Sequence, residues 1–257
     1  KGFSMKVVVL ATDSSSTWMM VNTLLKNYPD LHVVIEHPVS RIKLLKHRIR
    51  KVGLWVVIGQ ILFMLYLPVI RQLTQARILA LIENTGLSTK RPSGLVVQQF
   101  DSVNSHKCIA WLASEKPDVV VLNGTRIVSP EVLRSCNAVF LNTHCGITPA
   151  YRGVHGGYWA LYKGDKKNLG VTVHHVDEGV DTGGIIYQEV VIVDEQDNFL
   201  TYPVKQYIAG IMLMVRALSD VKSGRLSDFR REDLPSAVWM HPTIWQYLAA
   251  LWKKGVR

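Results

Sequence analysis

Short apolar runs recur along the first half of the chain, and each has the length of a strand. Residues 6–11 (KVVVLA) and 32–36 (HVVIE) are almost unbroken β-branched runs, a pattern typical of strands that are buried on both faces of a sheet. Further apolar runs at 96–97, 117–122 and 139–142 predict three more strands.

Between these runs, apolar residues recur at helical spacing over residues 18–25 and 104–114. The alternation of strands and helices predicts an α/β fold with a Rossmann-like, doubly wound, mostly parallel sheet. Ligands of such sheets bind beyond the carboxyl ends of the strands. We expect this catalytic core over residues 5–190 and a short C-terminal extension of strand and helix over 191–257. Residues 1–4 read as the remnant of a cloning tag.

The loop after the first strand is polar and rich in serine. Its sequence, T-D-S-S-S-T, lacks the G-x-G-x-x-G of dinucleotide-binding proteins. Ser14, Ser15 and Ser16 precede a predicted helix, where backbone N–H groups and the helix dipole favour an anion such as a substrate phosphate. The same serines also suit a simple helix cap. Both interpretations stay open.

Residues 54–70 (LWVVIGQILFMLYLPVI) carry no charge, and Pro68 lies near their end. The stretch is slightly short for a membrane span. A span would also place the neighbouring strands on opposite sides of a bilayer, so that one parallel sheet could not form. We therefore predict a hydrophobic helical insertion in the core, over about 40–84. Two alternatives remain for 54–70, namely a helix pair that is buried or forms a homo-oligomer, and an element lying on a membrane surface.

The net charge of +10 calls for an anionic partner. Basic residues cluster just before the apolar stretch and again near the end of the chain: Arg41, Lys43, Lys46, His47, Arg48, Arg50, Lys51, and Arg230, Arg231, Lys253, Lys254, Arg257. The first cluster favours the membrane-surface alternative, because anionic headgroups attract such runs. The three cysteines form no paired pattern, which indicates reduced thiols. We expect a cytoplasmic protein, with a peripheral place at the inner face of the membrane under that alternative.

The residues that carry chemistry lie between 122 and 188, where glycines mark turns. Asn142 and His144 stand two residues apart at the end of a predicted strand, so their side chains point to the same face. An amide donor and an imidazole in one pocket suit attack on a carbonyl, because the amide holds the oxyanion while the imidazole handles a proton. Asp181, in a D-T-G-G turn, could orient and charge that imidazole.

Taken as a set, Asn142-x-His144, the later Pro149 and Arg152-Gly153, and Asp181-Thr-Gly resemble the folate-dependent formyltransferases. That family contains glycinamide ribonucleotide transformylase, methionyl-tRNA formyltransferase and the sugar N-formyltransferases. The resemblance runs from about residue 5 to 226 and is dense over 117–188. It implies the formyltransferase fold, transferase activity and 10-formyltetrahydrofolate as co-substrate.

The resemblance also implies a role for each matching position. Asn142 would hydrogen-bond the formyl oxygen, His144 would stabilise its charge and assist proton movement, and Asp181 would raise the pKa of His144 and help to remove the proton of the amine. In the family the pterin ring binds largely to backbone, and the matching positions here are Arg126, Ile127, Val128, Asp177, Glu178, Gly179 and Val180. Arg152 is a candidate neighbour of an anionic substrate by position alone.

Some features depart from the family pattern. The segment after His144 reads C-G-I-T-P instead of P-S-L-L-P, and Gly146 predicts a more flexible loop there. The long tRNA-binding domain of the methionyl-tRNA enzymes is absent from this chain, and we expect no nucleic-acid partner. No metal is expected, because the spacing of His155, His174 and His175 resembles no zinc site.

The sequence therefore predicts an N-formyltransferase that acts on a primary amine of a small phosphorylated or nucleotide-linked metabolite. An amino sugar is the preferred substrate, since it suits an enzyme near a membrane. The alternatives are a 10-formyltetrahydrofolate hydrolase, a glycinamide ribonucleotide formyltransferase, and a folate-binding, membrane-recruited protein with little turnover.

Overall fold

The computed structural model describes residues 5–39 and 41–257, and the predicted tag remnant at 1–4 lies outside this part of the chain. Seven strands form one sheet in the order β3-β2-β1-β4-β5-β7-β8. Their bounds are β1 Val7–Ala11, β2 His32–Glu36, β3 Val97–Phe100, β4 Val119–Asn123, β5 Val139–His144, β7 Gly170–His175 and β8 Ile185–Val190. The first five are parallel, and β7 and β8 are antiparallel to their neighbours. The predicted mostly parallel α/β sheet is confirmed.

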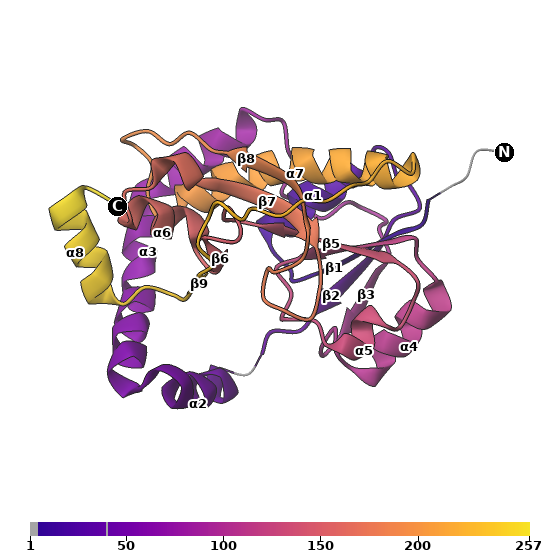
Figure 1. Cartoon of the computed structure of the whole chain (residues 1–257), viewed down its shortest axis with the longest axis horizontal. Coiled ribbons are helices and arrows are strands. Elements are labelled where there is room, and N and C mark those ends of the chain that lie inside the picture. The colour runs from indigo at the N-terminus through magenta and orange to yellow at the C-terminus, as the bar shows by residue number, and fades with distance from the viewer. Residues whose placement is uncertain (1–4, 40) are drawn as a thin grey trace.

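Helices cover both faces of the sheet (Figure 1). The bounds are α1 Ser15–Leu25 and α7 Thr201–Lys222 on one face, and α4 His106–Glu115 and α5 Pro130–Leu133 on the other. Alternate residues of β1 divide between the two layers, with Val7 and Val9 packed towards α1 and α7, and Val8 and Leu10 towards α4. Both faces of β1 are therefore buried, which explains its unbroken apolar run.

The chain winds outward from β1 in both directions. β2 and β3 follow on one side of β1, whereas β4 and β5 lie on the other. The direction in which successive strands are added therefore reverses between β1 and β4. The loops that follow these two strands leave towards opposite sides, and the carboxyl ends of the strands border a crevice there. β5 continues this edge and ends at His144, so the candidate catalytic side chains stand where doubly wound sheets bind their ligands.

The predicted helical insertion is present between β2 and β3. It consists of α2 (Arg41–Val52) and α3 (Leu54–Glu83), and the apolar stretch forms one continuous helix through Pro68 rather than a helix pair. In length and composition α3 is long and apolar enough to cross a membrane, which is weak evidence by itself. Val33 of β2 pairs with Val97 of β3, so the strands on either side of the insertion belong to one sheet and a crossing would break it.

The C-terminal part divides between two cores. α7 packs on β5, β7 and β8 and belongs to the core of the sheet, whereas α8 (Ile244–Lys254) packs against α3 beside α6 (Gly156–Tyr162). Aromatic side chains hold this second core together, with Phe63 of α3 in edge contact with Phe199, 4.8 Å between ring centroids, and tilted on Tyr247. The short strands β6 (Arg152–Gly153) and β9 (Val238–Trp239) pair nearby.

Candidate active site

The structure brings Asn142, His144 and Asp181 together. The first two lie on β5, two residues apart, and Asp181 comes from the loop between β7 and β8. Its Oδ2 lies 3.4 Å from Nδ1 of His144, and its Oδ1 lies 3.4 Å from Nδ2 of Asn142. The backbone N–H of Gly153 donates to Oδ2 of Asp181 at 2.8 Å, which fixes the carboxylate between the loop and the strand.

The two ring nitrogens of His144 both face oxygen atoms. Nε2 lies 2.6 Å from the carbonyl oxygen of Tyr151, and because a carbonyl only accepts, this nitrogen carries a hydrogen. Nδ1 faces Asp181. Burial lowers the pKa of His144, and the facing carboxylate offsets this only in part. The ring is therefore held neutral, beside a group that would stabilise it once it gains a proton at Nδ1.

His174 is a fourth member of the cluster, and no pattern in the sequence predicted it there. β5 and β7 pair antiparallel with His174 directly opposite Asn142. Nδ1 of His174 lies 2.7 Å from the carbonyl oxygen of His175 and so acts as the donor. In the neutral ring Nε2 then accepts from Nδ2 of Asn142, at 3.2 Å. This contact turns the Asn142 amide so that its N–H₂ group faces the site.

Asp181 is held as an anion in an unusual backbone conformation. Burial by itself would raise the pKa of Asp181, but attraction to the imidazoles of His144 and His174 when these are protonated, together with donation from the Gly153 amide, holds it below its ordinary value. Its φ of 50° lies in the left-handed region, which residues other than glycine rarely adopt. Such local strain is common at functional sites, where surrounding contacts impose it.

The loop before Asp181 is braced from both ends. The carboxylate of Asp177 accepts from the N–H of Gly179 at 3.1 Å and from the hydroxyl of Thr182 at 2.6 Å. Arg152 donates to the carbonyl oxygen of Val180 at 3.3 Å. Arg152 therefore supports the loop, and its predicted contact with substrate remains a prediction.

A second loop, at residues 126–128, forms the opposite side of the site. The buried carboxylate of Glu36 accepts from the backbone N–H of Arg126 at 2.7 Å and pairs with its guanidinium at 2.6 Å. Asn104 donates to the carbonyl oxygen of Ile127 at 2.9 Å. These contacts fix the backbone, while the side chain of Ile127 stays 64% exposed. An apolar side chain on a rigid loop suits contact with a flat ring.

A cavity of about 520 Å³ separates the two loops. Of the predicted residues, Asn142, His144, Asp181, Arg126, Ile127, Val128, Asp177, Gly179 and Val180 line it. It is also lined by aromatic residues that the sequence did not single out: Tyr158, Phe199, Tyr202 and Tyr207. Glu178 instead points to the surface, where it pairs with Arg134 at 3.3 Å. The volume is typical of small-ligand sites.

The serine loop takes the capping role in this structure. Ser14 is the N-cap of α1, and its hydroxyl accepts from the N–H of Thr17 at 3.3 Å. The same hydroxyl lies 3.0 Å from that of Ser16. Ser14, Ser15 and Ser16 do not line the cavity described above. Their predicted contact with substrate remains a prediction.

Gly146 is required by close packing beside the catalytic histidine. A Cβ atom at this position would lie 2.2 Å from the carbonyl oxygen of Tyr151 and 2.6 Å from Nε2 of His144. The glycine in C-G-I-T-P thus lets the loop pass directly over the imidazole. Gly146 is explained by this close packing and not by the predicted flexibility of the loop. The neighbouring Cys145 is half-buried, and desolvation of its thiol raises its pKa to about 12, so it stays protonated and is no nucleophile.

The arrangement resembles known proteins in both sequence and structure. The sequence profile of the family described as "Formyl transferase" matches residues 59–218. A methionyl-tRNA formyltransferase of Chlorobium limicola is 33% identical over 140 residues, which cover 54% of this chain and 44% of that protein. The chain thus spans less than half the length of the curated methionyl-tRNA formyltransferase that it matches.

Solved structures share the fold at low sequence identity. A glycinamide ribonucleotide transformylase from Symbiobacterium toebii superposes with a TM-score of 0.59 at 21% identity, covering 90% of this chain and 93% of that one. An N-formyltransferase from Helicobacter canadensis, solved with folinic acid and dTDP-3-aminofucose, gives a TM-score of 0.55 at 14% identity, covering 91% and 70%.

Proposed function

This chain belongs to the formyl transferase family, and on that premise we propose that it transfers the formyl group of 10-formyltetrahydrofolate to a primary amine. The observation that carries the proposal is the contact set of Asn142, His144 and Asp181 at the wall of one cavity. An amide donor, a neutral imidazole and an ionised carboxylate are groups that suit acyl transfer to an amine.

The size and lining of the cavity support a folate as its ligand. Two braced loops, 126–128 and 177–181, face each other across about 520 Å³. The backbone groups that these bracing contacts leave unengaged can supply donors and acceptors for the edge of a pterin ring, and the exposed Ile127 supplies an apolar surface for its face. The Helicobacter canadensis enzyme was solved with folinic acid, a formylated folate, which supports the same ligand class here.

Asn142, His144 and Asp181 each have a separate role in the transfer. Nδ2 of Asn142, turned by His174, gives up its long contact with Asp181 and donates that hydrogen to the formyl oxygen as that oxygen gains negative charge. The amine nitrogen bonds to the formyl carbon, and the bond from that carbon to N10 of the folate breaks. The amine loses one proton to the His144–Asp181 pair, and N10 gains one. Neutral His144 can accept this proton at Nδ1, where Asp181 stabilises the charge.

The acceptor that we propose is the amine of a small phosphorylated or nucleotide-linked metabolite, with an amino sugar preferred. The net charge of +10 suits an anionic substrate. The Helicobacter canadensis relative was solved with a nucleotide-linked amino sugar, whereas other relatives are named for methionyl-tRNA and glycinamide ribonucleotide. Tyr158, Phe199 and Tyr202 pack in the second core and close the cavity with an apolar wall, which suits the apolar parts of such a substrate.

The test is a screen of amine acceptors with 10-formyltetrahydrofolate. Release of tetrahydrofolate is followed by absorbance, and the product is identified by its mass, which rises by one carbonyl group. We expect release that depends on a nucleotide-linked amino sugar. Release without any amine would identify a hydrolase instead, and release with glycinamide ribonucleotide alone would assign that substrate.

A further inference from the structure

We propose that the outer face of α3 docks on an anionic lipid surface, with the helix lying parallel to the membrane. We define this docking face as Trp55, Leu62, Leu65, Val69 and Leu73. The last four are spaced three or four residues apart, so they share one side of the helix.

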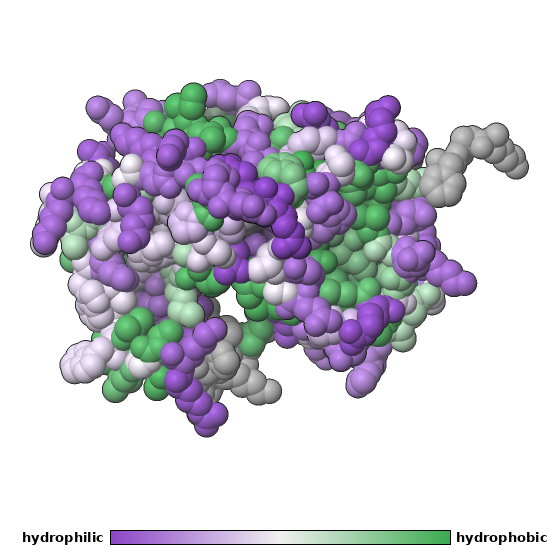
Figure 2. Space-filling view, viewed as in Figure 1, coloured by the Kyte–Doolittle hydropathy of each residue, from purple (hydrophilic) through white to green (hydrophobic). Residues whose placement is uncertain are grey.

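The docking face is apolar and uncovered. Trp55 is 77% exposed, Leu65 70% and Leu73 80%, and no charged residue occurs over 54–70. The outer side of a helix in a water-soluble protein normally carries polar residues. In the space-filling view, hydrophobic surface gathers at the corner where α2 meets α3, with hydrophilic side chains beside it (Figure 2). A patch of this kind marks a surface that binds another apolar body.

The charges around the face indicate what covers it. No acidic residue occurs between Glu36 and Glu83, whereas that segment holds eight lysines and arginines. Arg50 and Lys51 are exposed just before α3, and Arg71 is exposed beyond its charge-free stretch. Two copies of this chain that met through the face would bring these like charges together. An anionic surface would instead neutralise them.

The shape of the face favours lipid over an acidic protein. α3 presents a single convex cylinder here, and about 30 Å of helix separates Leu54 from Leu73 at the ordinary rise per residue. A bilayer conforms to such a ridge without a matching groove. Trp55 stands at one end next to the basic residues, the order of side chains found in helices that lie at the headgroup level.

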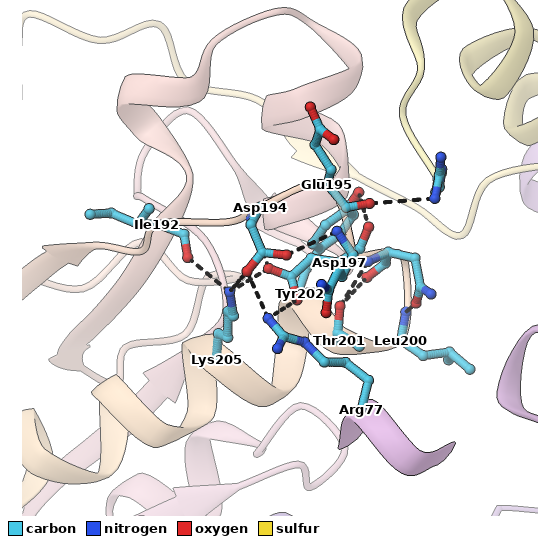
Figure 3. Close-up of polar contacts among 12 residues, drawn as sticks. Arg77, Ile192, Asp194, Glu195, Asp197, Leu200, Thr201, Tyr202 and Lys205 are labelled. Atoms are coloured by element: carbon cyan, nitrogen blue, oxygen red, sulfur yellow. Dashed lines mark hydrogen bonds and ion pairs between the residues drawn. The ribbon is translucent and has the colours of Figure 1, made fainter. Parts of the chain in front are cut away.

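The inner side of α3 shows why it would lie on the membrane rather than cross it. Phe63 and Ile70 are buried in the second core, at 1% and 6% exposure. Further along, Arg77 pairs with Asp194 at 2.7 Å, and Lys205 of α7 bonds to the same carboxylate (Figure 3). These contacts hold α3 to the catalytic body along its length, so only the outer side is free for lipid.

Flotation with lipid vesicles tests this proposal. The full chain is mixed with vesicles of phosphatidylcholine alone or of phosphatidylcholine with phosphatidylglycerol, at low and high salt. We expect binding to the phosphatidylglycerol vesicles that weakens with salt, since charge attraction is screened over about 8–10 Å at ordinary ionic strength. Arg50→Gln with Lys51→Gln should weaken it about 25-fold, at about fivefold for each charge. The matched control, Lys107→Gln with Lys222→Gln, should bind as the unaltered chain does.

The apolar contribution is tested in the same assay. Trp55→Ser with Leu65→Ser should weaken binding at least tenfold, because each buried side chain contributes about 1.5–3 kcal/mol. Val96→Ser with Ile192→Ser removes equally exposed apolar residues elsewhere and should leave binding unchanged. Absence of vesicle binding would overturn the proposal, as would equal loss in the control. Concentration-dependent dimers in light scattering, abolished by the Trp55/Leu65 variant without vesicle binding, would assign the face to a second copy instead.

Discussion

The active site and the docking face differ in how many contacts their side chains make within the folded chain. At the site, Asn142, His144, His174 and Asp181 contact one another or nearby backbone within 2.6–3.5 Å. On α3, large apolar side chains such as Leu65 remain open to solvent. The polar groups of the site are thus ordered before any substrate binds, whereas the apolar side chains of the docking face are left exposed for a binding partner. The two regions should therefore fail separately when they are changed.

The largest expected effect is on catalysis. His144→Ala or Asn142→Ala should lower the turnover number by about two to four powers of ten, because each removes a group that acts on the charge or proton of the reacting atoms. Steady-state release of tetrahydrofolate measures this loss. Vesicle binding should stay unchanged in both variants.

His175→Ala provides the matched control for these two variants. His175 neighbours His174 on β7 but does not line the cavity. Its loss should leave turnover within about twofold, since side-chain changes away from a site and its buried contacts have small effects. Near-normal turnover in the His144 variant would refute the role assigned to that ring.

The second prediction compares the two sides of α3. Phe63→Ala should lower the free energy of unfolding by about 3–5 kcal/mol, because a fully buried aromatic ring is removed from the second core. Leu65→Ala, two residues away on the outer side, should change it by less than about 0.5 kcal/mol. Denaturant titration followed by circular dichroism measures both. Similar losses in the two variants would mean that the outer side is covered within the folded chain.

The sequence was informative where a pattern repeats along one element. Period-two spacing placed Asn142 and His144 on one face of β5, and apolar runs located β1 to β5 to within a few residues, whereas β7 and β8 were not among the predicted strands. Asp181 came from the family resemblance rather than from spacing. The side of α3 that faces solvent was not predictable, because a helix that is apolar all round carries no signal for its covered face.

Contacts that depend on how strands and loops pair in three dimensions could not be predicted from the sequence. His174 and His175 are neighbours, and only the register of β5 against β7 decides which ring meets Asn142. The sequence predicted a flexible loop at Gly146. In the structure a glycine is needed there because the Tyr151 carbonyl and the His144 ring leave no space for a Cβ atom. Such close approaches leave no trace in the spacing of residues.

A third prediction concerns the pH profile. The pKa of His144 is lowered by burial, so the acid limb of the turnover profile should lie below the ordinary histidine value of about 6.5. Asp181→Asn removes the charge that favours the protonated ring. The pKa of His144 should then fall further, the acid limb should move to lower pH, and turnover should drop about 100-fold. A profile that does not move would show that Asp181 leaves the proton affinity of His144 unaffected.

The smallest effect is expected at the glycine above the imidazole. Gly146→Ala would place a Cβ against Tyr151 and His144, which should cost about 1–3 kcal/mol of stability through overpacking and displace the ring. Gly86→Ala, in open space with a φ of 68°, should cost about 1 kcal/mol and leave turnover unchanged. Thermal unfolding together with turnover separates the two. Normal turnover in the Gly146 variant would mean that the loop adapts without moving His144.

A crystal structure of the chain with 5-formyltetrahydrofolate tests the central claim most directly. We predict the pterin ring between the loops at 126–128 and 177–181, with its edge bonded to their backbone, and the formyl group directed towards Nδ2 of Asn142 and the His144–Asp181 pair. A folate bound outside this cavity, or one inside it whose formyl group points away from Asn142 and His144, would contradict the account.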